Sequence, residues 1–289
     1  HNTGRRQRQM CIRDRNKTIF TKFGSVRYFS NYFTAIDLVY RNVYEALHRT
    51  NDILGFMILI DGKKEAALLR EQLKKEVSDL KIKYNKVPGL TVILIGDLTP
   101  SQIYVRNKEK SANEVGLKSD VIKYPDSVEE KVILEKIDEL NKDNSVSGIL
   151  VQLPLPKHID KQKIIEAIDP SKDVDGFHPM NVGNLSSGYE SSVPCTPLGC
   201  YLLIKKIEPN LNGKKAVVVG RSNLNGKPMT QLLLKENCTV TITHSKTKDL
   251  KAECLEADIL IAAVGIPELV KGDWAVSYTH LRAHETVKN

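Results

Sequence analysis

The stretch KKAVVVGRSNLNGKPMTQLLL, residues 214–234, decides the fold of this chain. An apolar run over 215–219 leads into a turn between Gly220 and Gly226, and leucines at helical spacing follow. In a strand, glycine turn and helix of this order, backbone N–H groups can approach a phosphate at the N-terminus of the helix. We therefore predict a dinucleotide site here. Because the spacing departs from G-x-G-x-x-G, a turn that needs its glycines only for geometry is the alternative.

Apolar runs and helical periodicities alternate on both sides of this stretch. We expect helices over 63–84, 100–115, 127–142, 160–168, 195–207 (beginning after Pro197) and 226–236. We expect strands over 91–95, 120–124, 147–152, 215–219, 239–243 and 258–264. Strands that alternate with helices form parallel sheets covered on both faces. The predicted fold class is therefore α/β with two α/β domains, a three-layer N-terminal domain and an incomplete NAD(P)-binding Rossmann domain.

The two ends of the chain break this pattern. We interpret residues 1–56 as a non-native or disordered extension, with Met57 as a plausible start, and residues 277–289 as a non-native-looking tail. An arginine-rich transit peptide is the alternative for the N-terminus, although its acidic residues weigh against that. The remaining chain divides into domains at 57–195 and 196–276.

Composition narrows the class of protein. Much of the net charge of +8 lies in the N-terminal arginines, without interleaved aromatic residues or zinc-finger spacing, so we expect no nucleic-acid partner. Five cysteines form no C-x-x-C pair, which indicates a reducing, cytoplasmic compartment and no metal site. No apolar run approaches the roughly 20 residues that span a bilayer, so we expect no membrane association.

A first group of polar residues lies on the expected helix 100–115. Tyr104 and Lys108 are four residues apart and share a face, and Ser101 lies three residues before Tyr104. The helix follows a strand whose carboxyl end is where open parallel sheets bind ligands. A lysine there can exchange protons when desolvation favours its neutral form. The alternative is a solvated helix face. Thr99 is the expected N-cap, Gln102 its capping-box partner and Gly116 the C-terminal end.

Two further polar features follow buried strands. Gln152 precedes LPLP, and its amide can donate to and accept from a heterocycle, although a bond to local backbone is an equal alternative. In KDVDGFHP, Asp173 and Asp175 could both face one cleft, since alternate residues of an extended stretch share a side. One carboxylate could bind a pterin edge, and the alternative is a turn with solvated acids. Too few oxygen ligands are present for a metal.

The residues after the expected strand 239–243 bear on the cofactor. NAD-binding units usually carry an acid here, whereas this chain has His244 and Ser245, followed by a lysine. Arg221 and Ser222 of the preceding turn could face the same ribose phosphate. We therefore predict NADP rather than NAD. For His244, a surface or capping role is as strong a possibility as a direct contact.

Taken together, these segments resemble the methylenetetrahydrofolate dehydrogenase/cyclohydrolase family, in the family's order over residues 57–275. The matching stretches are IDGKKEAALLREQLK, SQIYVRNKEKSANEVG, GILVQLPLP, DPSKDVDGFHPMNVGNL, PCTPLGC, GKKAVVVGRSNLNGKPM, THSKT and ADILIAAVG-x-PELVKGDW. The resemblance implies a folate-binding catalytic domain over 57–195 and a partial NADP-binding domain over 196–276. It implies oxidation of 5,10-methylenetetrahydrofolate with NADP, then hydrolysis to 10-formyltetrahydrofolate. Because family members commonly dimerise, we also expect a homodimer.

The resemblance also assigns roles to residues. It implies that Lys108 is the catalytic lysine with Tyr104 as its partner, that Gln152 orients the lysine and that Asp175 holds the pterin. The implied folate pocket further includes Ser101, Leu153 and Pro154. The implied cofactor contacts are Gly220, Arg221, Ser222, Gly226, His244 and Ser245. The nearest rivals are a monofunctional cyclohydrolase and an NAD-dependent relative, and a distant one is a basic nucleic-acid-binding protein.

The chain departs from the family pattern in two places. Asn225 stands where the family usually has an apolar residue, which puts cofactor affinity in doubt. After Trp274 the family continues with further strands, and here the sequence changes character. We therefore expect the last strand, 258–264, to be an unprotected edge with little cover. We also expect the 289-residue chain to be marginally stable and largely inactive, whereas the intact gene product is an enzyme.

Overall fold

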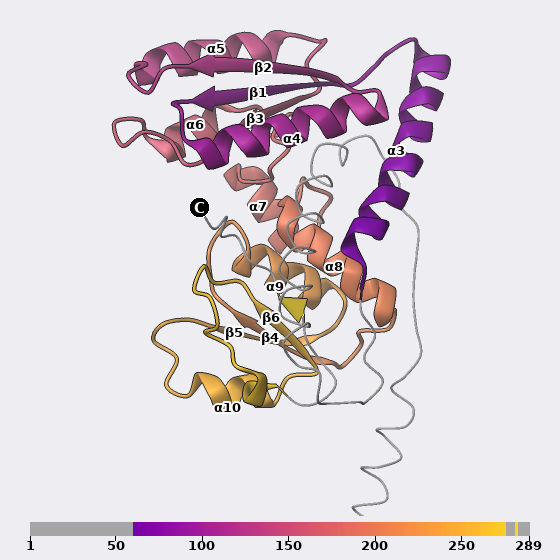
Figure 1. The fold of residues 1–289 in the computed structure, drawn as a ribbon, viewed down its shortest axis with the longest axis vertical. Helices are drawn as coiled ribbons and strands as arrows, with labels where there is room; N and C mark the ends of the chain where they lie inside the picture. The colour runs from indigo at the N-terminus through magenta and orange to yellow at the C-terminus, as the bar shows by residue number, and fades with distance from the viewer. Residues whose placement is uncertain (1–59, 276–280, 283–289) are drawn as a thin grey trace, which may run out of the picture.

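The computed structural model describes residues 60–275 and 281–282, which form two parallel sheets with helices on both faces (Figure 1). The expectations for 1–56 and Met57, and those for most of 277–289, lie outside the described residues. The α/β fold class with two domains is confirmed. The first sheet has β1 (Gly89–Ile95) between two other strands, and the second has β4 (Lys215–Val219) between two others. Nearly all residues of β1 and β4 are buried.

The first sheet has the strand order β2-β1-β3, and all its strands are parallel. Its strands are β1 (Gly89–Ile95), β2 (Lys118–Tyr124) and β3 (Gly148–Val151). Its covering helices are α4 (Thr99–Val115), α5 (Glu130–Lys142) and α6 (Lys161–Ala167). Side chains of β1 alternate between the two faces, because Ile93 packs with α5 and α6 whereas Val92 packs with α4. The carboxyl ends of β1 and β3 therefore open between these two layers of helices.

The second sheet has the order β5-β4-β6-β7. Its strands are β4 (Lys215–Val219), β5 (Thr239–Thr243), β6 (Ile259–Ala262) and β7 (Leu281–Arg282), and its helices are α9 (Gly226–Lys235) and α10 (Leu250–Leu255). Val218 packs on the α9 side and Val217 on the α10 side. The expectation of an unprotected last strand is wrong, because β7 pairs in parallel with β6 through Ile261 and Leu281. The pairing extends over two residues of the edge.

Two helices connect the domains: α3 (Gly62–Tyr84) and α8 (Cys195–Ile207). Figure 1 shows α3 starting beside the second domain and ending beside the first. One hydrophobic cluster includes Leu73 of α3, Val115 of α4, Leu198 of α8 and Leu232 of α9, so both domains share buried surface. An ion pair between Lys206 of α8 and a glutamate of α3 adds a polar contact.

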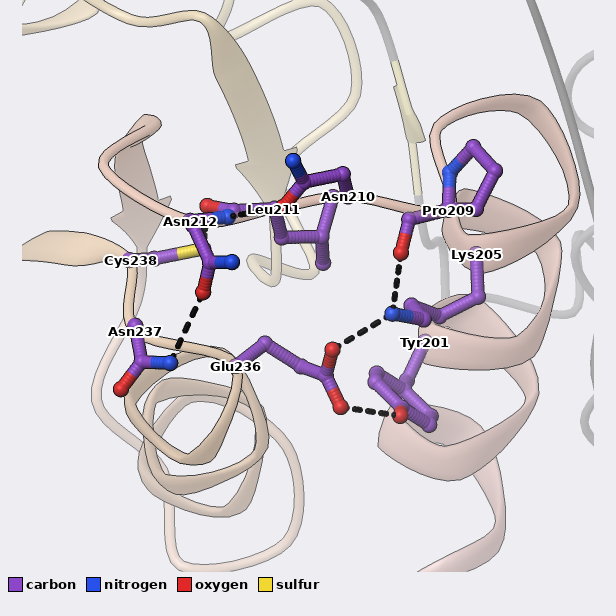
Figure 2. A network of polar contacts seen from close by, with 9 residues as sticks. All are labelled: Tyr201, Lys205, Pro209, Asn210, Leu211, Asn212, Glu236, Asn237 and Cys238. Carbon is purple, nitrogen blue, oxygen red and sulfur yellow. Dashed lines mark hydrogen bonds and ion pairs between the residues drawn. The ribbon is translucent and has the colours of Figure 1, made fainter.

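A polar network ties α8 to the end of α9 (Figure 2). The carboxylate of Glu236, the C-cap of α9, accepts hydrogen bonds from the hydroxyl of Tyr201 at 2.7 Å and from Nζ of Lys205 at 2.5 Å. The same ammonium donates to the carbonyl of Pro209 at 2.5 Å. Since both charged side chains are mostly buried, this network fixes the rotation of α8 on the second domain.

Several local predictions were wrong. Helix α4 already includes Thr99, so Leu98 is the N-cap and Gln102 bonds Asp97 at 3.4 Å instead of completing a capping box. Helix α8 begins before Pro197, which lies in its first turn, where a missing N–H costs nothing. The helices α7 (Pro179–Ser186) and α10 were not predicted, because both are short and lack an apolar repeat of useful length. The expected C-terminal end of α4 at Gly116 is confirmed by a left-handed backbone with φ of 84°.

Candidate active site

The first pair of predicted residues meets at the carboxyl end of the first sheet. Gln152 directly follows β3, and its Oε1 accepts from Nζ of Lys108 on α4 at 3.5 Å. The amide nitrogen of Gln152 donates to the carbonyl of Leu153 at 2.8 Å, which fixes the amide orientation so that its oxygen faces the lysine. The Leu153–Pro154 peptide bond that follows is cis. Two residues that are 44 positions apart in sequence thus form one polar pair.

The two carboxylates of KDVDG have different surroundings. Asp173 is buried, and its oxygens accept from the backbone N–H groups of Gly176 at 3.1 Å and His178 at 2.9 Å, and from the amide of Asn181 at 2.8 Å. The carboxylate of Asp173 therefore bonds two backbone N–H groups that follow it and one side chain of α7. Asp173 and Asp175 do line one small cavity, as expected, but the carboxylate of Asp173 is bonded by these donors and organises the loop.

Asp175 is the carboxylate that belongs to the site. Burial raises the pKa of Asp175, whereas the nearby positive charge of Lys108 lowers it, and Asp173 adds a raising effect. The thiol of Cys195, at the start of α8, donates to Oδ1 of Asp175 at 3.8 Å. Burial also raises the pKa of the Cys195 thiol, so it stays protonated and can donate. The site therefore combines groups from α4, the KDVDG loop and α8.

The other predicted folate residues lie around this cluster. Ser101 is buried in the first turn of α4, and Tyr104 is half-buried one turn before Lys108. Leu153 is half-buried, and it lines the same small cavity as Asp175, whereas Pro154 is exposed. The structure brings Lys108, Gln152 and Asp175 together by contact or charge. Ser101 and Tyr104 lie on the same helix as Lys108, and Leu153 and Pro154 directly follow Gln152.

The glycine turn of the second domain requires its two glycines for steric reasons. Gly220 has φ of +116°, and a Cβ there would lie 2.3 Å from the carbonyl oxygen of Ala263. A Cβ on Gly226 would lie 2.0 Å from the carbonyl oxygen of Gly220. The turn therefore brings backbone against backbone at the N-terminus of α9. Arg221 is exposed, and the hydroxyl of Ser222 accepts from the N–H of Asn225 at 3.1 Å. This cradle fits a dinucleotide phosphate.

The remaining residues at this turn and at the end of β5 have mixed roles. Asn225 is buried as the N-cap of α9, with no side-chain cap bond in the described structure, so it takes a core position despite its polarity. His244 accepts from the N–H of Lys246 through Nδ1 at 3.1 Å, so this ring nitrogen bonds the local turn, and a direct cofactor contact stays a prediction. Ser245 is exposed. The residues directly after β5 include no carboxylate that would repel a 2′-phosphate.

These features define a class: a two-domain α/β enzyme with a lysine, amide and carboxyl site in one domain and a dinucleotide cradle in the other. Family models refine it. The catalytic domain model of tetrahydrofolate dehydrogenase/cyclohydrolase matches residues 60–175, and the NAD(P)-binding domain model matches residues 194–279. The chain belongs to the tetrahydrofolate dehydrogenase/cyclohydrolase family.

Individual relatives agree with this placement. The chain is 84% identical over 218 residues to the bifunctional protein FolD of Pelagibacter ubique, an alignment that covers 75% of this chain and 78% of that protein. The crystal structure of FolD from Campylobacter jejuni matches with a TM-score of 0.74 and 47% identity, over 76% of this chain and 78% of that one. A Trypanosoma brucei structure, described as a complex with NADP cofactor and inhibitor, matches with a TM-score of 0.74 and 35% identity, covering 77% and 76%.

Sequence reasoning missed three residues that shape the site. They are Lys172 and Asn181, which hold the KDVDG loop, and Cys195, which contacts Asp175. The sequence signal that could have identified them is their position within or next to the matched motifs. Within the described part of the chain, no group of three or more His, Cys, Asp or Glu side chains could hold a metal ion. No helix within those residues is long and apolar enough to cross a membrane.

Proposed function

We propose that this protein oxidises 5,10-methylenetetrahydrofolate with NADP⁺ and hydrolyses the resulting methenyl compound to 10-formyltetrahydrofolate. The observation that carries the proposal is the contact of Lys108 with Gln152 at 3.5 Å, next to the half-buried carboxyl of Asp175. The naming of FolD relatives as bifunctional, together with matches to both family domain models, supports the same two activities.

In the oxidation step the protein's task is positioning. The dinucleotide, when bound, accepts the hydride from the one-carbon bridge of the folate. The turn between Gly220 and Gly226 would let its phosphates approach the backbone N–H groups at the start of α9. Asp175 would hold the pterin through its carboxyl, and Leu153 would lie against the ring. Fixing both reactants in this way turns a bimolecular encounter into a first-order step.

In the hydrolysis step the chain supplies acid–base chemistry. Water adds to the methenyl carbon, and Nζ of Lys108 is the group that would take one proton from that water. Gln152 holds the lysine nitrogen through its amide oxygen, which is itself fixed by the bond to Leu153. The ring C–N bond then breaks, its nitrogen takes a proton, and the formyl group remains on the other nitrogen. The hydroxyl of Tyr104, one turn before Lys108, would hydrogen-bond the same proton.

The choice of NADP over NAD has a local basis. At the end of β5 the chain carries His244 and Ser245, and Arg221 lies exposed in the preceding turn. A 2′-phosphate would find a hydroxyl, a cation and no adjacent carboxylate there. The NADP-bound Trypanosoma brucei structure supports the same cofactor.

The test is a pair of single-turnover assays on the 289-residue chain, with protein in excess over substrate so that slow steps remain measurable. The first follows NADPH formation from 5,10-methylenetetrahydrofolate, with NAD⁺ in a parallel arm. The second follows loss of the methenyl chromophore without dinucleotide. We expect both reactions at low rates, in keeping with the low activity expected of the 289-residue chain. We expect NADP⁺ to be preferred by about tenfold or more, since a 2′-phosphate adds charge-assisted contacts.

The outcomes separate the rival readings. Hydrolysis without oxidation indicates a monofunctional cyclohydrolase, and comparable rates with NAD⁺ overturn the cofactor assignment. Loss of both reactions, with salt-dependent binding to DNA, would favour the nucleic-acid-binding reading. We also expect a homodimer in the cytoplasm, and sedimentation at several protein concentrations tests the dimer.

A further inference from the structure

A lysine outside the reacting groups has its entire hydrogen-bonding capacity used within the first domain. Nζ of Lys172 donates to three backbone carbonyls, those of Leu140 at 2.9 Å, Asn141 at 2.8 Å and Asp143 at 2.7 Å. An ammonium has three donors, so these three acceptors saturate it. The carbonyls belong to the last turn and C-cap of α5, where helical acceptors lack partners and a cation is favourable.

The backbone of Lys172 is held as firmly as its side chain. Its carbonyl accepts from the N–H of Ile149 on β3 at 2.8 Å, and Asp173 forms a bridge with the same strand residue. Its own N–H donates to Asp169 at 2.8 Å. Strand β3 continues directly into Gln152, the partner of the site lysine. Lys172 therefore sits where the strand that carries Gln152 and the loop that carries Asp175 meet.

The path from Lys172 to Asp175 leaves the loop little freedom. Asp173 ties the loop to the N–H groups of Gly176 and His178. Gly176 has φ of +69°, and a Cβ there would lie 2.6 Å from the carbonyl oxygen of Ser192, so the turn is pressed against the segment that enters α8. The N-terminal end of this loop is anchored by Lys172, so the position of the loop depends on the bonds of this lysine.

We propose that Lys172 is a positioning residue for Asp175: by capping α5 with its ammonium it sets where the pterin-binding carboxyl lies relative to Lys108. The proposal rests on the proposed function, since it assigns Asp175 to folate binding. A displacement of about 1 Å at such a carboxyl can lower the rate of the reaction that it positions by up to about a hundredfold. If Lys172 were a helix cap with no role in the site, its substitution would lower stability without changing the affinity for one ligand more than for the other.

The experiment measures equilibrium binding of tetrahydrofolate and of NADP⁺ to the full chain by calorimetry. Lys172→Met keeps the length of the side chain and removes the donors. The matched control is Lys142→Met, which removes a cation from the same end of α5, where Lys142 makes an exposed contact with Asp138 and does not touch the loop. Lys172→Gln, which keeps an amide donor, is measured in parallel in case the methionine variant does not fold.

We expect Lys172→Met to weaken tetrahydrofolate binding by about tenfold or more while NADP⁺ binding stays within about twofold. Lys172→Gln should change affinity in the same direction by a smaller factor, and Lys142→Met should change neither ligand. The pH profile gives a further readout. The charged and titratable groups that face Asp175 are Lys108, Asp173 and Cys195, and moving the carboxyl away from Lys108 should shift its titration to higher pH.

Other results overturn the proposal. Unchanged tetrahydrofolate affinity in folded Lys172→Met or Lys172→Gln protein would mean that the lysine only caps the helix. Parallel weakening of both ligands would mean a general loss of structure. If the unaltered chain itself fails to bind tetrahydrofolate, the proposed function falls, and that result is separate from any effect of the variants.

Discussion

The two ligand regions of the molecule are built on different principles. In the first domain the site consists of side chains that contact each other, with Lys108 bonded to Gln152 and Asp175 facing both Lys108 and Cys195. In the second domain the site consists of backbone, because Gly220 and Gly226 leave no room for a Cβ. The first region is preassembled from four segments that are distant in sequence, and the second is a local turn.

The difference teaches where each site is vulnerable. A site of side chains can lose its chemistry through one substitution while the fold remains, because the backbone does not depend on the functional groups. A site of close backbone approach cannot lose its glycines without moving the strand and helix that they join. We therefore expect side-chain variants in the first region to lose activity while they keep stability. We expect glycine variants in the second region to lose stability.

The largest effect is expected from Lys108→Met. If the first region is a site of chemistry, methenyl hydrolysis should fall by about 10²–10⁴-fold, the range typical for loss of a general acid–base group. NADP⁺ affinity and the unfolding midpoint should stay close to those of the unaltered chain. Lys110→Met, an exposed lysine on the same helix, is the control. Retained hydrolysis in Lys108→Met would remove the lysine from the mechanism and break the comparison.

A smaller effect, on stability, is expected from Gly226→Ala. The new Cβ would lie 2.0 Å from a backbone oxygen that cannot rotate away, so we expect destabilisation by about 2–3 kcal/mol and loss of NADP⁺ binding. Gly183→Ala in α7 is the control, since a Cβ there meets nothing within 4 Å and alanine favours a helix by about 0.5–1 kcal/mol. Urea unfolding with a calorimetric binding assay measures both. Equal stability of the two variants would contradict the close-approach account.

The smallest effect concerns pH and the contact between α8 and α9. Burial alone would raise the pKa of Glu236, but hydrogen bonds from Lys205 and Tyr201 and the charge of Lys205 hold it below its usual value. A lowered carboxyl pKa stabilises the folded state above the unfolded-state pKa, about 4.3 for glutamate, and this contribution is lost as pH falls through the folded-state value.

Glu236→Gln should therefore cost about 1 kcal/mol near neutral pH, and it should flatten the acid side of the stability profile. Urea midpoints measured from neutral pH down to about pH 3 test this. Glu135→Gln, in an exposed pair with Lys131, should leave the profile unchanged. An unaltered slope in Glu236→Gln would show that the network in Figure 2 does not couple the two helices.

Much of the fold was predictable because its signals are local. The strand 215–219 and the helix start at Gly226 were predicted from an apolar run and a glycine, and both bounds are confirmed. The N-cap of α4 was not, because Thr99 adopts a helical backbone and Leu98 takes the cap position without a side-chain bond. Short helices such as α10 carry too few residues for a periodicity to emerge.

The sequence by itself determined the α/β alternation, the glycine turn and the set of polar residues that follow buried strands. These depend on interactions between residues a few positions apart. Only the tertiary structure decided that Asp173 organises its loop while Asp175 faces Lys108, and that Lys172 closes the end of α5. Those assignments depend on which donors the folded chain brings to each group, and the donors come from segments tens of residues apart.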